Sequence, residues 1–410
     1  MSMVGYGVLN QNGKNIIINL DTPPLLKKLD TLVFDCDGVL LKTAESYDNA
    51  IKETVNFVFS NVFNRKISDS VSSKDILMIR NTGGFNNDWE LTYAFILYYF
   101  FKLSVFLSKR AQITIPENTS IKEAISFLTE LRSVFKLSNI TYEKITSMKD
   151  YTLEDYISYL DIYGLRTARK VLYSWAENMA QINFLQRIEK YLRFQKDLEN
   201  DLITRVFQEF YLGSLITEFY NVEPILGVKD GFINTERLNG ELKDYERLLE
   251  LGLKKFGIAS SRPRKEAEYT LRKNGIIPEM VNMNALIFLE DIRSEEERIE
   301  KQTGQKISLE KPNPASIILS LKKMGEVKTA AFIGDTAADI YAANEAKKIF
   351  KSPIISIGFT GQAANPQILE KRFMNLKTDI IVPSVSELVL IIDDIKTGDS
   401  EVLRKCEHLI

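Results

Sequence analysis

The sequence contains very little cysteine and histidine. Its 410 residues include two cysteines, Cys36 and Cys406, and a single histidine, His408. Two cysteines so far apart cannot build a disulfide framework or a CxxC metal site, and this usage is typical of the reducing cytoplasm. One histidine excludes an HExxH zinc site and disfavours histidine-based triads and acid/base pairs. Any chemistry is therefore expected to use carboxylates, hydroxyls, lysines and bound ions.

An excess of charge of one sign is also missing. The 53 Lys and Arg residues nearly balance 55 Asp and Glu residues, for a net charge of −2, so a nucleic-acid partner is not expected. Residues 1–15 lack the basic and apolar regions of a signal peptide, which favours a cytoplasmic location. The hydrophobic share of 45% is that of an ordinary globular protein. The oligomeric state is not indicated by the sequence.

Long apolar runs are scarce, and only residues 91–107, LTYAFILYYFFKLSVFL, need a membrane check. This run is short for a membrane span, contains Lys102, and follows NNDWE, which supplies helix-capping residues. We therefore expect a buried helix here, with a membrane segment as the alternative.

Glycine and proline are nearly absent between Phe85 and Leu212, where apolar residues recur at spacings of three and four. This pattern predicts a helical region from about residue 45 to about residue 220. Strands and helices alternate after it, which predicts a parallel sheet covered by helices on both faces. We expect a discontinuous core of residues 1–44 and 222–410, interrupted by a helical domain of residues 45–221.

The elements expected in the core can be assigned to ranges. Residues 6–20 predict a hairpin around an Asn-Gly turn. Segment 223–232 is either the return hinge or a set of turns, and the charged run 293–306 is a solvated helix or loop. Further strands are predicted at 30–35, 254–260, 285–290, 328–334, 353–359 and 378–383, and helices at 262–275, 313–325 and 337–348.

Carboxylates stand at the ends of two predicted strands. Asp35 and Asp37 come just before Gly38, and Asp335 and Asp339 follow the strand 328–334. Asp-Gly between apolar runs is by itself a hairpin signal. In a parallel sheet, however, strands end at a common edge where ligands bind, so both pairs are expected at one crevice.

Two other residues complete this predicted site. Ser260 ends a third strand, and Lys311 precedes a helix. Carboxylates, a hydroxyl and a lysine suit a divalent, oxygen-preferring ion such as Mg²⁺ together with a phosphate group.

The motifs DCDGV, ASS, KPNP and GDTAAD, in this order, resemble the four motifs of the haloacid dehalogenase-like (HAD) hydrolase superfamily. The resemblance covers residues 30–44 and about 222–390 and is nearest to subfamily IA-like phosphatases with a large helical cap inserted after the first motif. It implies a Rossmann-like, doubly wound parallel sheet with an all-helical cap. Relatives often carry another aspartate where this chain has Lys42, at a position outside the reacting centre.

The resemblance also implies roles for the predicted site residues. Asp35 would be the nucleophile, and Asp37 the general acid and then the general base. Ser260 would hold a phosphoryl oxygen, and Lys311 would neutralise the nucleophile and the phosphate. Asp335 would bind Mg²⁺ together with Asp35 and the backbone carbonyl of Asp37.

Some neighbouring residues have two interpretations. Asp339 either assists the metal or is an N-terminal helix charge. The amides of Ser261 and Arg262 are expected to bind phosphate at a helix start, while the side chains of Arg262 and Arg264 are either solvated or in contact with substrate. Cys36 is expected to pack behind the site rather than to act as a nucleophile.

In the insertion, the polar stretch GGFNNDW has two interpretations of its own. As a hypothesis, Asn86, Asn87, Asp88 and Trp89 contact the substrate. The alternative is that they cap a helix, with Trp89 in the core of the insertion.

We predict a Mg²⁺-dependent phosphatase that acts on a small phosphorylated metabolite. A small substrate is favoured because a large cap excludes water and bulky macromolecules. No membrane partner is expected. A phosphomutase that uses the same aspartyl phosphate is the first alternative, disfavoured because the insertion contains no histidine. A non-catalytic binding or regulatory protein on the same scaffold is the second.

Overall fold

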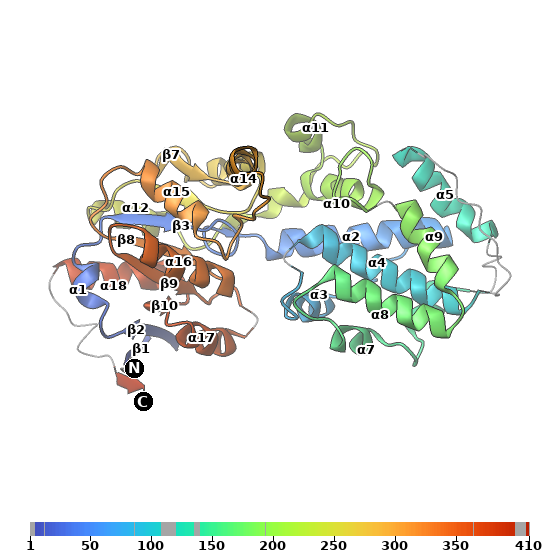
Figure 1. Cartoon of the computed structure of the whole chain (residues 1–410), viewed down its shortest axis with the longest axis horizontal. Coiled ribbons are helices and arrows are strands. Elements are labelled where there is room, and N and C mark those ends of the chain that lie inside the picture. Colours follow the sequence, from blue (N-terminus) through green and yellow to red (C-terminus); the bar gives the residue numbers. More distant parts are fainter. Residues whose placement is uncertain are drawn as a thin grey trace. The chain divides into compact units, whose positions relative to one another are not determined.

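The computed structural model describes residues 5–11, 13–85, 87–107, 120–134, 140–192, 194–363, 365–397 and 407–409. The chain forms two compact units (Figure 1). The first combines Met1–Ala44 with Glu236–Ile410, and the second is Glu45–Thr235. The second unit is therefore an insertion into the first.

The first unit is built on a large, mostly parallel sheet. Among the described residues its strand order is β11-β1-β2-β10-β9-β8-β3-β6-β7. The strands from β10 to β7 are parallel to one another, whereas β2, β1 and β11 pair antiparallel at the other edge. The strands are β1 (Tyr6–Gln11), β2 (Lys14–Asn19), β3 (Thr31–Phe34), β6 (Phe256–Ala259), β7 (Val281–Ile287), β8 (Ala330–Gly334), β9 (Ile354–Phe359), β10 (Ile380–Val382) and β11 (Glu407–Leu409).

Helices cover both faces of this sheet, as β3 illustrates. Leu32 and Phe34 belong to one apolar cluster and Val33 to another, because successive side chains of a strand point to opposite faces. The first cluster includes residues of α1 (Pro23–Leu26), α12 (Leu242–Glu250), α13 (Arg264–Lys273) and α18 (Val385–Thr397). The second includes residues of α15 (Ala315–Lys323) and α16 (Ala337–Ile349), and α14 (Leu289–Thr303) and α17 (Pro366–Asn375) complete the helices of this unit. The predicted doubly wound α/β fold is confirmed.

One local prediction differs from the structure at its end. The strand predicted at 285–290 is β7, which ends at Ile287, because the amide of Phe288 donates to Asp291 at the start of α14 (2.8 Å). The charged run 293–306 lies mostly in α14, so its prediction as a helix or loop is confirmed. The pairing of β11 with β1 was not expected, since a three-residue strand has almost no pattern of its own.

The two ends of the insertion leave and re-enter the first unit side by side. β4 (Leu41–Lys42) pairs antiparallel with β5 (Arg237–Leu238) in a separate small sheet. Strands this short carry no sequence signal, and tertiary pairing alone defines them. The small sheet holds together the two points between which the insertion is attached.

Among its described residues, the regular elements of the second unit are helices. Its helices are α2 (Ala44–Phe63), α3 (Ser73–Arg80), α4 (Asp88–Val105), α5 (Ile121–Val134), α6 (Tyr142–Thr146), α7 (Leu153–Ser158), α8 (Leu165–Asn178), α9 (Ile182–Leu192), α10 (Leu202–Leu212), α11 (Leu215–Tyr220) and the 3-10 helix η2 (Phe232–Thr235). Helix α4 packs against α8, α9 and α10 (Figure 1).

The long apolar run is the body of α4, and its side chains are buried within the second unit from Leu91 to Ser104. A helix that is apolar all round is expected to be buried on all sides. In the part of the chain that the structure describes, no helix is long and apolar enough to cross a membrane.

The segment predicted as a return hinge is attached to the second unit. The buried carboxylate of Glu209, on α10, accepts hydrogen bonds from the amides of Ile225, Leu226 and Gly227 at 2.7 Å. The chain therefore re-enters the first unit at Glu236 and not at the predicted residue 222. The role of the insertion as a cap stays a prediction.

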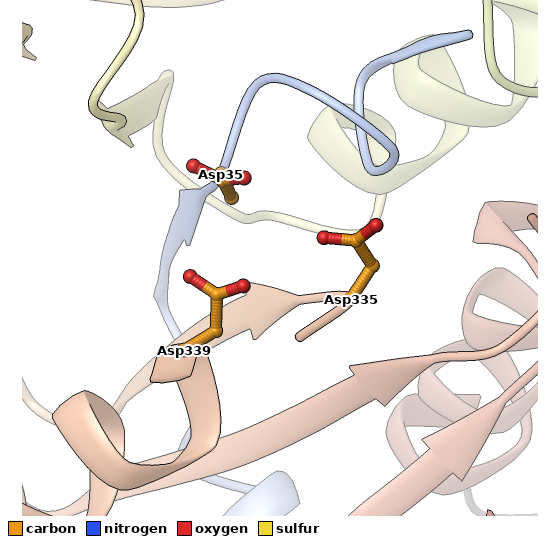
Figure 2. Close-up of side chains that lie close together, drawn as sticks. All are labelled: Asp35, Asp335 and Asp339. Carbon is orange, nitrogen blue, oxygen red and sulfur yellow. The ribbon is translucent and has the colours of Figure 1, made fainter. Parts of the chain in front are cut away.

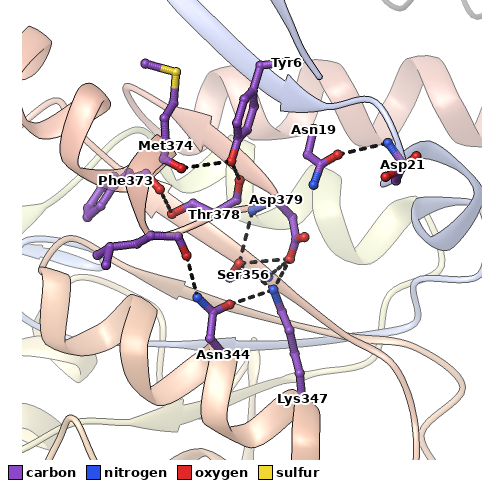
Figure 3. A network of polar contacts seen from close by, with 11 residues as sticks. Tyr6, Asn19, Asp21, Asn344, Lys347, Ser356, Phe373, Met374, Thr378 and Asp379 are labelled. Atoms are coloured by element: carbon purple, nitrogen blue, oxygen red, sulfur yellow. Dashed lines mark hydrogen bonds and ion pairs between the residues drawn. The ribbon is translucent and has the colours of Figure 1, made fainter. Parts of the chain in front are cut away.

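A polar network ties the N-terminal hairpin to the sheet (Figure 3). The hydroxyl of Tyr6 donates to the carbonyl of Thr378 (3.1 Å), and burial raises the pKa of Tyr6 to about 12. The neighbouring carboxylate of Asp379 accepts from the amide of Ser356 (2.7 Å) and pairs with Lys347 (2.5 Å). The side chain of Asp379, just before β10, therefore links β9 and α16.

We expect Asp379→Ala to lower the free energy of unfolding by about 2 kcal/mol, because it removes the ion-pair partner of a half-buried lysine and the acceptor of a buried amide. Urea unfolding measures the change. The control is Glu345→Ala, which removes an exposed ion pair with Lys348 and should cost less than about 0.5 kcal/mol. Equal effects of both variants would contradict this account of the network.

Candidate metal and phosphate site

The predicted site residues gather at the carboxyl edge of the sheet. Asp35, Ser260 and Asp335 directly follow the adjacent parallel strands β3, β6 and β8. The backbone stays in register beyond the strands, since the amide of Asp35 donates to Ile333 O (2.8 Å) and that of Ser260 to Ile287 O (3.0 Å). Strand ends of a parallel sheet thus place these side chains next to one another.

Three carboxylates face one another here, from the ends of β3 and β8 and the start of α16 (Figure 2). Oxygens of Asp35, Asp335 and Asp339 lie within 4.8 Å of one another. The ammonium of Lys311 lies 2.6 Å from Asp35 Oδ1 and 2.6 Å from Asp339 Oδ1, and its side chain is nearly buried. One lysine therefore serves two of the three carboxylates.

The buried charge of this cluster is unbalanced. Desolvation raises the pKa of Asp35 to about 7 and that of Asp335 well above its ordinary value, although Lys311 opposes both shifts. Asp35 and Asp339 in turn raise the pKa of Lys311, against its own desolvation. Three carboxylates and one ammonium need additional positive charge in order to be ionised together. Clustered carboxylate oxygens are suitable ligands for a divalent ion such as Mg²⁺.

Asp339 has the position at the start of a helix that the sequence suggested, and its role as a metal ligand stays a prediction. Its Oδ2 accepts from the amide (3.1 Å) and the hydroxyl (2.6 Å) of Thr336 and so caps α16, while its Oδ1 binds Lys311. These capping hydrogen bonds fix the orientation of the Asp339 carboxylate. Its second oxygen is thereby aimed at the cluster.

The loop after Asp35 packs closely against Asp335. Gly38 has φ +76°, and a Cβ at this position would lie 1.9 Å from Asp335 Oδ2. Cys36 is buried in the apolar core behind the loop, as expected, and Lys42 is exposed on β4. Glycine is required at residue 38 both by its backbone angle and by the neighbouring carboxylate.

Arg262 is not on a solvated surface, which corrects one of its two interpretations. Its side chain is 0% exposed and pairs with Asp37 (2.8 Å) and with Glu236 (2.7 Å). Glu236 was missed because a lone glutamate in NTERLN gives no functional signal. Arg264, by contrast, is partly exposed and pairs with Glu268 and Asp291.

The predicted phosphate contacts of the ASS motif lie beside this arginine. Ser260 is buried, and its hydroxyl accepts weakly from the amide of Arg262 (3.4 Å), while Ser261 is exposed. Helix α13 begins at Arg264. Phosphate binding by Ser260, Ser261 and Arg262 stays a prediction.

The candidate residues of the insertion make contacts within their own unit. Asn87 caps α4 by accepting from the amide of Glu90 (3.1 Å), and Asp88 pairs with Arg80 (2.7 Å). Trp89 donates to Gln208 (3.3 Å). Asn86 lies outside the described residues. Capping is thus observed for Asn87, and substrate contact by Asn86, Asn87 and Asp88 stays a prediction.

Comparisons with known proteins agree with this geometry. A sequence model described as haloacid dehalogenase-like hydrolase matches residues 29–347. No curated protein matches the chain.

Among solved structures, the Northeast Structural Genomics Consortium target ZR25 is similar, with 17% identity, a TM-score of 0.63, and coverage of 90% of this chain and 99% of that one. The phosphatase Tt82 from Thermococcus thioreducens has 19% identity and a TM-score of 0.46, covering 84% and 98% of the two chains. A predicted phosphoglycolate phosphatase from Haemophilus somnus has 13% identity and a TM-score of 0.39, covering 89% and 98%. At these identities the first likeness supports a common fold only.

We expect Mg²⁺ to raise the melting temperature more at pH 8 than at pH 5.5. With its pKa raised from 3.8 to about 7, Asp35 contributes stability that is complete below pH 4 and is lost as the pH rises through 7 in the metal-free protein. A bound cation offsets that loss. Differential scanning fluorimetry should show a rise of about 5 °C at pH 8 and less than about 2 °C at pH 5.5.

Asp335→Asn should remove most of this Mg²⁺ effect, and Asp30→Asn, at the opposite end of β3, should keep it. A melting-temperature rise that is equal at both pH values would show that Mg²⁺ does not bind at this cluster.

Gly38→Ala should weaken Mg²⁺ binding at least about 10-fold in isothermal titration calorimetry, because the new methyl group displaces Asp335. The matched control is Gly252→Ala, since Gly252 has φ +80° but no atom within 4 Å of the added Cβ. Both variants should lose about 1 kcal/mol of stability from backbone strain. Unchanged affinity in Gly38→Ala would refute the role given to this close contact.

Proposed function

The chain belongs to the haloacid dehalogenase-like hydrolases, and on this premise we propose that it is a Mg²⁺-dependent phosphatase of a small phosphorylated metabolite. One observation carries the proposal. Asp35 lies against Lys311 at an edge where Asp335 and Asp339 add carboxylates, and Asp37 follows two residues later. These residues would supply a nucleophile, a counter-charge, cation ligands and a second carboxyl group.

In the first step, an oxygen of Asp35 forms a bond to phosphorus while the bond from phosphorus to the leaving oxygen breaks. Asp37 gives its proton to that leaving oxygen, so the alcohol departs neutral. The product on the protein is an aspartyl phosphate. Splitting the hydrolysis into two steps replaces one difficult displacement by two easier ones.

In the second step, Asp37 takes a proton from water as the water oxygen attacks the phosphorus of the aspartyl phosphate. The bond to Asp35 breaks, phosphate leaves, and both carboxyl groups return to their starting states. The same residue therefore serves first as acid and then as base.

Charge is the main obstacle to these steps. A carboxylate and a phosphate oxygen repel each other by about 4 kcal/mol at 4 Å in an effective dielectric of about 20. Lys311 contacts the nucleophile directly and offsets part of this repulsion. A divalent cation held by Asp35, Asp335 and Asp339 would supply the remaining positive charge and keep Asp35 ionised at neutral pH.

Asp35→Asn should lower turnover of p-nitrophenyl phosphate with Mg²⁺ at least about 1,000-fold, because the amide cannot attack phosphorus. Released p-nitrophenol measures the rate. Asp30→Asn is the control and should retain activity within about 3-fold.

The proposal fails if the wild-type protein hydrolyses neither this ester nor any member of a panel of phosphorylated metabolites. Transfer of the phosphoryl group to a sugar instead of water would identify the phosphomutase alternative.

A further inference from the structure

The segment that returns from the insertion, residues 236–239, is attached to the loop that carries Asp37. β5 within this segment pairs with β4, which follows the loop. The amide of Asn239 donates to Leu40 O (2.7 Å), and its side-chain Nδ2 donates to Gly38 O (3.0 Å). The backbone of the Asp37 loop is therefore held by the return segment on both sides of the turn.

A chain of buried charges makes the same connection through side chains. Arg262 bridges Asp37 and Glu236, with one guanidinium nitrogen on each carboxylate. The side chains of Arg262 and Glu236 are both 0% exposed, and Thr270 donates a further hydrogen bond to Glu236 (3.1 Å). A planar guanidinium held at one end by a buried carboxylate has little freedom at its other end.

Asp37 differs from both of these residues in its exposure. Its side chain is 33% exposed, and it precedes a glycine with a positive φ. A side chain in this position has several rotamers available unless a neighbour selects one. Arg262 is such a neighbour, and Glu236 determines where the guanidinium lies.

We propose that Glu236 and Arg262 are positioning residues that orient Asp37 for proton transfer to the leaving oxygen. The inference rests on the proposed function. It gives Arg262 a role through Asp37, whereas the ASS motif had suggested contact with phosphate. Glu236, the first residue after the insertion, thereby helps to orient the general acid Asp37 through Arg262.

This role predicts a dependence on the leaving group. When the bond from phosphorus to oxygen breaks, a strongly acidic phenol can depart as its anion, whereas a weakly acidic phenol needs the proton from Asp37. Poor orientation of Asp37 therefore slows phenyl phosphate more than 2,4-dinitrophenyl phosphate. A general loss of folded protein would slow both esters by the same factor.

The test compares Glu236→Gln and Arg262→Lys with the wild-type protein on these two esters, in the presence of Mg²⁺. We expect kcat for phenyl phosphate to fall 10- to 100-fold with KM within about 3-fold, and the rate of the first burst of 2,4-dinitrophenol to stay within about 3-fold. Asp393→Asn breaks a partly exposed ion pair with Arg247 in the same unit and should change neither rate.

A double-mutant cycle tests whether the effect passes through Asp37. In the Asp37→Asn background, Glu236→Gln should lower the rate less than about 3-fold further. The reason is that an asparagine at residue 37 has no acidic proton to donate, so its orientation no longer matters. If Glu236→Gln lowers the rate by the same factor in both backgrounds, the inference is wrong.

Other outcomes separate the inference from its premise. If the wild-type protein hydrolyses neither ester, the proposed function fails and the inference fails with it. If the wild-type protein is active and the variants slow both esters equally, only the inference is overturned. If circular dichroism shows Glu236→Gln to be unfolded, Thr270→Val is tested instead. A loss of rate on phenyl phosphate alone supports the inference. Rates that change by the same factor on both esters, or that do not change, overturn it.

Discussion

The crowding of two buried carboxylates and one partly buried carboxylate around one lysine is the interaction on which the rest of the site depends. Asp35, Asp335 and Asp339 reach the same space because two parallel strands and one helix end there, and Lys311 compensates only part of their charge. Desolvation makes the remaining negative charge costly, as the raised pKa of Asp35 shows. Such a site favours a bound cation, since added positive charge lowers the cost of keeping the carboxylates ionised.

The backbone around this cluster is arranged to keep the carboxylates close together. The loop after Asp35 can approach Asp335 only because residue 38 has no side chain, and Thr336 orients Asp339 through its cap. The same loop is closed by β4 and β5, the two short strands that flank the insertion. The helical insertion thus begins and ends at this small sheet, and the main sheet stays continuous.

Much of the core could be predicted from local patterns. Runs such as TLVF and AAFIG are buried on both faces, so they are apolar throughout and are easy to recognise as strands of a parallel sheet. Predictions failed where the signal was short or non-local. The return point was placed at residue 222 instead of Glu236, because the binding of residues 225–227 to Glu209 cannot be deduced from turn-forming residues alone. Strands of two or three residues at β4, β5 and β11 were missed for the same reason.

The sequence by itself determined the chemical types at the site and their order along the chain, because carboxylates that end apolar strands must meet at one edge of a parallel sheet. Only the tertiary structure decided how these groups are paired. It placed Lys311 between Asp35 and Asp339, and it buried Arg262 between Asp37 and Glu236. Lys311 is 276 positions from Asp35 in the sequence, and Arg262 is 225 positions from Asp37. Pairing of charges depends on distances and desolvation in the folded chain, and neither is encoded in the spacing of residues along the sequence.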